Sequence, residues 1–212
     1  MADRPIIFSA PMVRALLDGR KTQTRRVLPL AHPKFSHQNV LDPDMLVDKQ
    51  YVWFWDGVHD CVGASWPLPY APGDRLWVRE NCATWGDHEA IYRADDAVEY
   101  GLAVSDGKFG AKWKARPSIH MPRWASRLTL TVTEVRVQRL QDISEADAVA
   151  EGALQSWTGS DPESDTRTAL NEFEALWNSL HGPGAWDANP WVVALTFTVQ
   201  RGNIDQIGDA NG

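Results

Sequence analysis

A lysine and a threonine lie three residues apart in the segment Gly19-Arg-Lys-Thr-Gln-Thr24, directly after a predicted helix. Threonine becomes a nucleophile when a base removes its hydroxyl proton, and lysine becomes a base when burial or a neighbouring cation frees its amine. Lys21 and Thr24 could therefore form the centre of a hydrolytic site. The alternative is a polar turn at the surface, and the segment alone leaves both interpretations open.

The chain lacks the motifs of several large catalytic and binding classes, among them GxGxxG, the P-loop, GxSxG and HExxH. The six histidines show no metal-ligand spacing. Two cysteines, Cys61 and Cys82, are too few for a disulfide scaffold or a cysteine zinc site. We therefore expect no metal, no cofactor and two reduced thiols in a cytoplasmic protein.

Charge is distributed unevenly along the 212 residues. The formal net charge of −7 argues against a protein that coats polyanions. Residues 1–29 nevertheless hold six basic residues against two acidic ones, and residues 108–127 hold six basic residues and no acidic one. If these segments meet in space, they form a site for a phosphate or a nucleotide; otherwise they are solvated faces.

Eleven tryptophans are spread from Trp53 to Trp191. They could occupy half-buried core and edge positions, or a few rings could form a wall for a flat ligand such as a base. No apolar run approaches the ~18 residues of a membrane-spanning helix. The first residues resemble neither a secretion signal nor a transit peptide.

These candidate residues need elements that position them, and the pattern predicts several. We expect strands at residues 5–8, 75–79, 90–93 and 191–199, a hairpin from the apolar stretches 51–55 and 58–62, and helices at 10–18, 144–152 and 165–181. Leu170, Phe173, Leu176, Trp177 and Leu180 define the apolar face of the last helix. Residues 127–137 predict a strand whose apolar phase slips between Val132 and Val135, as at a β-bulge.

Strands outnumber crossover helices in this order, which argues against a doubly wound parallel sheet. We expect an α+β fold, a small, mixed, partly closed β-barrel with short helices at its rim, in a single domain over residues 1–200. Residues 201–212 have almost no apolar content and predict a disordered tail.

The stretch Ala15–Arg26 resembles the opening of ASCH-domain proteins, whose pattern is a helix followed by G-x-K-T-x-T-x-R and a strand entered through a Gly-Asp turn. Gly73-Asp74 supplies that turn, and Leu140–Gly152 matches the later L-x-x-[IL]-[ST]-x-x-x-A-x-x-E-G. The closing strand matches Trp191–Phe197. The resemblance implies a PUA-like fold with insertions at about 29–71, 81–118 and 153–164, as in longer phage and prophage ASCH proteins.

One branch of this family, the small bacterial N4-acetylcytidine amidohydrolases, is similar at three catalytic positions, Lys21, Thr24 and Glu151. The resemblance implies that Thr24 attacks the acyl carbonyl and that Lys21 acts as base and then assists departure of the cytosine amine. Glu151 would hold the lysine or polarise a water. The alternative is a structural hydrogen-bond network in a non-catalytic module.

Further residues are candidates for substrate binding. Arg20, Arg25 and Arg26 could hold a phosphate or a carbonyl oxygen, or be surface charges. Trp77, Glu80 and Tyr92 could line a base pocket or pack in the core, and His120 and Arg123 could bind substrate or serve a loop. The expected partner is a small modified cytidine, with acyl groups larger than acetyl as an option and no membrane. The rival functions are a module that binds RNA or a modified base in DNA, and a ribonuclease.

Overall fold

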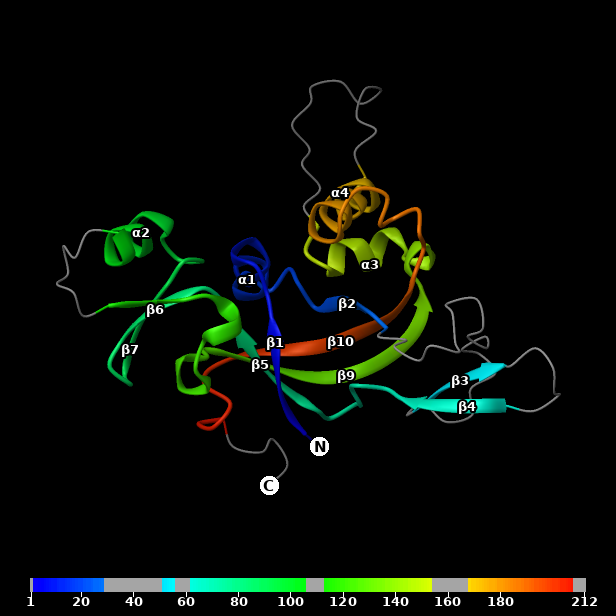
Figure 1. The fold of residues 1–212 in the computed structure, drawn as a ribbon, viewed down its shortest axis with the longest axis horizontal. Coiled ribbons are helices and arrows are strands. Elements are labelled where there is room, and N and C mark those ends of the chain that lie inside the picture. The colour runs from blue at the N-terminus through cyan, green and yellow to red at the C-terminus, as the bar shows by residue number, and fades with distance from the viewer. Residues whose placement is uncertain (1, 29–50, 56–61, 106–112, 154–167, 208–212) are drawn as a thin grey trace, which may run out of the picture. The chain divides into compact units, whose positions relative to one another are not determined.

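The computed structural model describes residues 2–28, 51–55, 62–105, 113–153 and 168–207 (Figure 1). In chain order its elements are β1 (Asp3–Ile7), α1 (Ala10–Leu17), β2 (Gln23–Val27), β3 (Tyr51–Trp55), β4 (Val62–Pro67), β5 (Arg75–Arg79), β6 (Cys82–Trp85), β7 (Glu89–Tyr92), α2 (Ala97–Ser105), β8 (Lys114–Arg116), the short 3₁₀ helices η3 (Ser118–His120) and η4 (Arg123–Ala125), β9 (Leu128–Arg139), η5 (Leu140–Asp142), α3 (Glu145–Ala150), α4 (Ala169–His181) and β10 (Trp191–Arg201). The predicted α+β class is confirmed. Within these ranges no helix is long and apolar enough to cross a membrane.

The chain forms two compact units. The first comprises Met1–Lys21, Gly73–Val132 and Phe197–Gly212, and the second comprises Thr22–Pro72 and Thr133–Thr196. The strand order of the largest sheet is β1-β5-β9-β10-β2, and the long strands β9 and β10 each contribute residues to both units. β1 runs parallel to β5, whereas β5–β9 and β10–β2 are antiparallel pairs. The sheet is therefore mixed, as expected, and its partial closure into a barrel stays a prediction.

The change of phase in β9 is visible in the exposure of its side chains. Val132 is buried, Thr133 and Glu134 are exposed, and Val135 is buried again. Such a slip turns the following side chains to the other face of a sheet. It falls where the chain passes from the first unit into the second, so this one strand supplies buried side chains to both units.

In the first unit, the end of α1 fixes the start of the candidate segment. Gly19 adopts a positive φ of 73°, its N–H donates to Leu16 O, and the N–H of Arg20 donates to Ala15 O at 2.9 Å. This is a Schellman motif, which glycine favours because it has no Cβ to clash. The next N–H, that of Lys21, also donates to Ala15 O, at 3.0 Å. Backbone bonds therefore hold Lys21 directly at the helix end.

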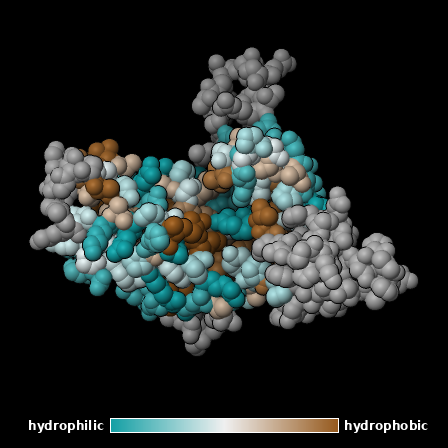
Figure 2. All heavy atoms as spheres, in the orientation of Figure 1, coloured by the Kyte–Doolittle hydropathy of each residue, from teal (hydrophilic) through white to brown (hydrophobic). Residues whose placement is uncertain are grey.

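A second, small sheet of order β7-β6-β8 belongs to the first unit, and α2 packs on β6 and β7 (Figure 1). Cys82 is buried there against Met121 and Ala125. Burial, followed by the charge of Glu80, raises the pKa of the Cys82 thiol to about 11. The thiol is therefore protonated at neutral pH. Apolar side chains gather at the surface over α2 (Figure 2), where Val98 and Val104 are exposed.

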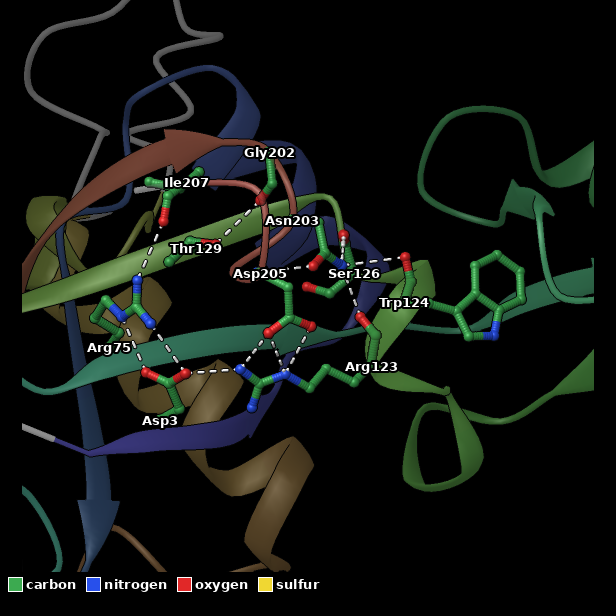
Figure 3. A network of polar contacts seen from close by, with 10 residues as sticks. All are labelled: Asp3, Arg75, Arg123, Trp124, Ser126, Thr129, Gly202, Asn203, Asp205 and Ile207. Carbon is green, nitrogen blue, oxygen red and sulfur yellow. Dashed lines mark hydrogen bonds and ion pairs between the residues drawn. The ribbon is translucent and has the colours of Figure 1, made fainter. Parts of the chain in front are cut away.

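The C-terminal residues of the first unit are packed through Ile207 rather than disordered. Ile204 is buried, and the amide of Asn203 donates to the carbonyl oxygens of Arg123, Trp124 and Ser126 at 2.8, 3.1 and 2.9 Å (Figure 3). The prediction of a disordered tail is therefore wrong for residues 201–207, because hydrogen bonds hold a segment that has little apolar content. Residues 208–212 lie outside the described ranges.

In the second unit, two capped helices pack beside one another (Figure 1). The Ser144 hydroxyl accepts the N–H of Asp147 at the start of α3, and the Thr168 hydroxyl accepts the N–H of Asn171 at the start of α4. The Glu145 carboxylate also accepts the first N–H groups of α4. The core around both helices consists of Leu140, Ile143, Ala148, Ala169, Phe173, Trp177, Trp186 and Val192.

The structure differs from the prediction at one residue of the last helix and in the second strand of the hairpin. Leu180 is 60% exposed, so its assignment to the apolar face of α4 is wrong. The described part of that helix begins at Ala169, and residues 165–167 lie outside the described ranges. β3 and β4 form the expected antiparallel hairpin, but the second strand lies at residues 62–67 rather than at 58–62. Much of the expected insertions, including residues 29–50, 106–112 and 154–164, is likewise not described.

Replacing Asn203 tests how the C-terminal segment is held. Asn203→Ala removes the donor of three carbonyl hydrogen bonds at a buried position, and we expect it to lower the free energy of unfolding by about 1–3 kcal/mol. Gln206→Ala, at an exposed position three residues further on, should change it by less than about 0.5 kcal/mol. Urea denaturation followed by tryptophan fluorescence measures both, and equal small effects would contradict this role of Asn203.

Candidate active site

The three candidate catalytic residues are all buried. Lys21, Thr24 and Glu151 are 1%, 1% and 4% exposed. The alternative that Lys21 and Thr24 form a polar surface turn is therefore wrong. Burying a hydroxyl, an ammonium or a carboxylate costs free energy unless it is hydrogen-bonded or paired, so the partners of each group define the local chemistry.

Lys21 is the last residue of the first unit. Its ammonium nitrogen lies 5.5 Å from the centre of the Phe8 ring, within the range of a cation–π contact. The Schellman motif at the end of α1 fixes the backbone position of Lys21. Thr24 and Glu151 belong to the second unit.

Thr24 lies in the middle of β2, a strand that the sequence did not predict, opposite Leu195 of β10. Thr24 and Arg26 are two residues apart on β2, so their side chains lie on the same face of the strand. Arg26 Nη1 donates to the Thr24 Oγ1 at 2.8 Å and to the Arg25 carbonyl oxygen at 3.0 Å. A charged donor on the hydroxyl oxygen stabilises negative charge that develops there when the proton leaves.

Arg26 also interacts with the candidate Glu151 and with two titratable groups that sequence reasoning missed, Tyr70 and His181. Burial lowers the pKa of Arg26, whereas the nearby Glu151 and Tyr70 raise it. Burial and the charge of Arg26 together lower the pKa of His181, the last residue of α4. The His181 imidazole packs on Trp177 with ring centres 4.2 Å apart. The environment of the Thr24 hydroxyl thus includes a cation with several ionisable neighbours.

Arg25 joins β2 to α3 through two carboxylates. Its Nη1 donates to Glu151 Oε1 at 3.2 Å and its Nη2 donates to Asp147 Oδ2 at 2.9 Å. The Arg25 side chain is 0% exposed, and those of Glu151 and Asp147 are 5% and 16% exposed. Asp147 and Glu151 are four residues apart and therefore lie on one face of the helix and its end. One guanidinium bridges both.

An outer layer of side chains holds Asp147. Gln23 Nε2 donates to Asp147 Oδ1 at 2.9 Å, and Arg136 Nη2 lies 3.4 Å from the same oxygen. Burial alone would raise the pKa of Asp147, but the hydrogen bond from Gln23 and the charges of Arg25 and Arg136 outweigh it, so this pKa lies below its ordinary value. The N–H of Asp147 is capped by the Ser144 hydroxyl, and its carboxylate points to β2.

The remaining substrate-binding candidates lie in the first unit, several of them with protein partners. Arg20 pairs with Asp18 at 2.8 Å on the surface, and Trp77 is nearly buried beneath the guanidinium of Arg79. His120 is exposed at the end of η3. Substrate binding by these residues stays a prediction.

Glu80 and Tyr92 belong to a cluster built on Arg127. Arg127 donates to both Glu80 oxygens, at 2.9 and 3.1 Å, and to Asp95 at 2.6 Å, and its guanidinium lies 3.9 Å from the Tyr92 ring centre. The Tyr92 hydroxyl donates to the Ala125 carbonyl oxygen. Burial raises the pKa of Glu80 although Arg127 opposes it. These contacts account for the buried Glu80 and the half-buried Tyr92 without a ligand.

Arg123 is part of an ion-pair chain that connects the ends of the first unit (Figure 3). Its guanidinium donates to Asp205 at 2.7 Å and to Asp3 at 2.6 Å, and Asp3 also accepts from Arg75 at 2.9 Å. Together with the Asn203 hydrogen bonds, this chain ties β1, β5 and η4 to the C-terminal segment. The position of Arg123 is therefore set by protein carboxylates.

Within the described ranges, no group of three or more histidine, cysteine, aspartate or glutamate side chains is arranged to hold a metal ion. Comparisons of the chain with protein-family models, curated proteins and solved structures give no match.

The pH dependence of stability tests the Asp147 contacts. Because the pKa of Asp147 is lower in the folded protein than its ordinary value of 3.8, these contacts stabilise the fold above that pH. The stabilisation is lost as the pH falls through the folded pKa. Asp147→Asn should therefore lower the free energy of unfolding by about 2 kcal/mol at pH 7, and this difference should shrink steadily below pH 4.

Denaturation of both proteins at several pH values provides the measurement. Glu134→Gln is the matched control, because that carboxylate is 57% exposed and lies 3.8 Å from Arg136. A difference between Asp147→Asn and the unchanged protein that is constant from pH 7 to pH 3 would contradict the assignment.

Proposed function

We propose that this chain is an ASCH-type amidohydrolase that cleaves the N4-acyl amide of a cytosine-type nucleoside and needs no cofactor. The observation that carries the proposal is the burial of Lys21, Thr24 and Glu151, with a guanidinium on the Thr24 hydroxyl. Proteins rarely bury charged side chains such as those of lysine and glutamate unless these are paired. A hydroxyl beside a charged donor suits nucleophilic attack. A partly closed PUA-like barrel remains the architecture that we propose for the whole chain.

In the proposed first half-reaction the roles are those that the resemblance implies: Thr24 Oγ1 attacks the acyl carbon while the Lys21 amine takes the hydroxyl proton. This step requires Lys21 in its uncharged form. The C–N4 bond of the tetrahedral intermediate then breaks, and the Lys21 ammonium returns the proton to N4. The products of this half are a free cytosine amine and an acyl ester of Thr24.

In the second half-reaction, water attacks the ester carbon and releases the carboxylic acid, and Thr24 regains its proton. Glu151 polarises this water, which is a task for a carboxylate held in a fixed orientation. Arg26 stabilises the charge on Oγ1 in both halves, since it already donates to that oxygen at 2.8 Å. The substrate in this account is a small modified cytidine, which suits a chain with a net charge of −7.

Loss of N4-acetylcytidine, followed by its ultraviolet absorbance, tests the activity. Thr24→Val removes the hydroxyl at nearly constant volume, and we expect it to lower kcat at least about 1,000-fold. Lys21→Ala removes the base and should lower kcat by about 10²- to 10⁴-fold. Thr22→Val is the matched control, because Thr22 is exposed two residues away and should retain full turnover.

Two results would overturn the proposal. One is full turnover by Lys21→Ala, and the other is no turnover by the unchanged chain. In the second case, salt-dependent retention on RNA would support the rival function of a binding module.

A further inference from the structure

The guanidinium of Arg25 is committed to protein carboxylates. It bonds to Glu151 Oε1, Asp147 Oδ2 and Gln23 Oε1 at 3.2, 2.9 and 3.3 Å, and its side chain is fully buried. The sequence leaves Arg25 either as a candidate for holding a substrate phosphate or carbonyl oxygen or as a surface charge. In this geometry its terminal nitrogens instead define where the Glu151 carboxylate lies.

Glu151 has an electrostatic reason to need this cation. It caps the C-terminal end of α3, where the helix dipole disfavours a negative charge, and a second carboxylate, Asp147, lies one turn before it. Arg25 reaches Glu151 and Asp147 together and offsets both effects. Its bond to Oε1 also fixes the orientation of the carboxylate plane, since a guanidinium binds carboxylates in a narrow range of geometries.

Asp147 in turn restrains the guanidinium. Gln23 and Arg136 bind Asp147 from β2 and β9, so Arg25 cannot swing away from Glu151 without breaking bonds at its other end. The Arg25 Nε–H is buried and has no acceptor among the described residues.

We propose that Arg25 is a positioning residue that holds Glu151 in its catalytic orientation, and that Asp147 acts on Glu151 through Arg25. This inference rests on the proposed function and gives Arg25 a role different from substrate contact. It predicts that loss of Arg25 affects the chemical step rather than the binding of substrate.

The test is a double-mutant cycle of Arg25→Met and Glu151→Gln, with kcat and KM measured on N4-acetylcytidine. Arg25→Met should lower kcat about 100-fold, the effect of a misplaced catalytic group, and change KM less than about threefold. In the Glu151→Gln background the same change should have almost no further effect on kcat, because Arg25 has lost the group through which it acts.

Two variants separate positioning from loss of the fold. Arg25→Lys should recover part of kcat, because lysine can pair with one carboxylate but cannot bridge two. Arg136→Met removes a partner of Asp147 and so loosens Arg25 only indirectly, and it should lower kcat much less than Arg25→Met does. Millimolar guanidinium should restore part of the activity of Arg25→Ala by occupying the vacated space.

The outcomes distinguish the two proposals. If the unchanged chain turns over substrate but the two changes multiply in the double mutant, or Arg25→Met acts through KM alone, Arg25 contacts substrate and this inference is overturned. If Arg25→Met, Arg25→Lys and Arg136→Met lose activity in proportion to their loss of folded protein, the role is structural and the inference is again overturned. No turnover by the unchanged chain overturns the proposed function, and this inference with it.

Discussion

The buried cation of Arg25 is the constraint on which the second unit depends. It lies on β2, and the carboxylates that neutralise it come from α3, more than 120 positions later in the chain. Burying the guanidinium without these partners would cost several kcal/mol of folding free energy. The fold of the second unit therefore requires β2 and the end of α3 to lie next to each other. The capped start of α3 and the Glu145 bonds to α4 extend the same constraint to the second helix. The polar cluster thus specifies a geometry that the apolar core around Trp177 and Phe173 alone would not fix.

Patterns of neighbouring residues in the sequence predict most of the helices and strands that are stabilised by apolar spacing and capping residues. The helix of residues 10–17 follows from its apolar spacing and from Gly19, and β9 follows from its alternating threonines and aliphatic residues. The strand β2 does not, because both of its faces carry charged or polar side chains that are buried by pairing rather than by hydropathy. The packed residues 203–207 are missed for the same reason, since the Asn203 amide and a single buried isoleucine hold them.

Some residues of the candidate site can likewise be identified from the sequence, and others cannot. Lys21, Thr24 and Glu151 can be selected from residue type and resemblance, and their burial excludes the surface turn. The contacts of Asp147, Arg136 and His181 could not be selected, because each depends on a partner distant in the sequence. The tryptophan excess is also partly explained. Trp77, Trp177, Trp186 and Trp191 are buried. Trp85, at the end of β6, and Trp113, just before β8, contact each other with ring centres 6.0 Å apart.

The central claim is that Thr24 carries the acyl group during the reaction. The most direct measurement is mass spectrometry of peptides from protein that has been mixed with N4-acetylcytidine and stopped with acid within the first turnovers, for the unchanged chain and for Glu151→Gln. We expect one acetyl group on the peptide that contains Thr24, and a larger acetylated fraction in Glu151→Gln, where hydrolysis of the ester is slowed. Release of cytidine while the Thr24 peptide stays unmodified in both proteins would contradict it.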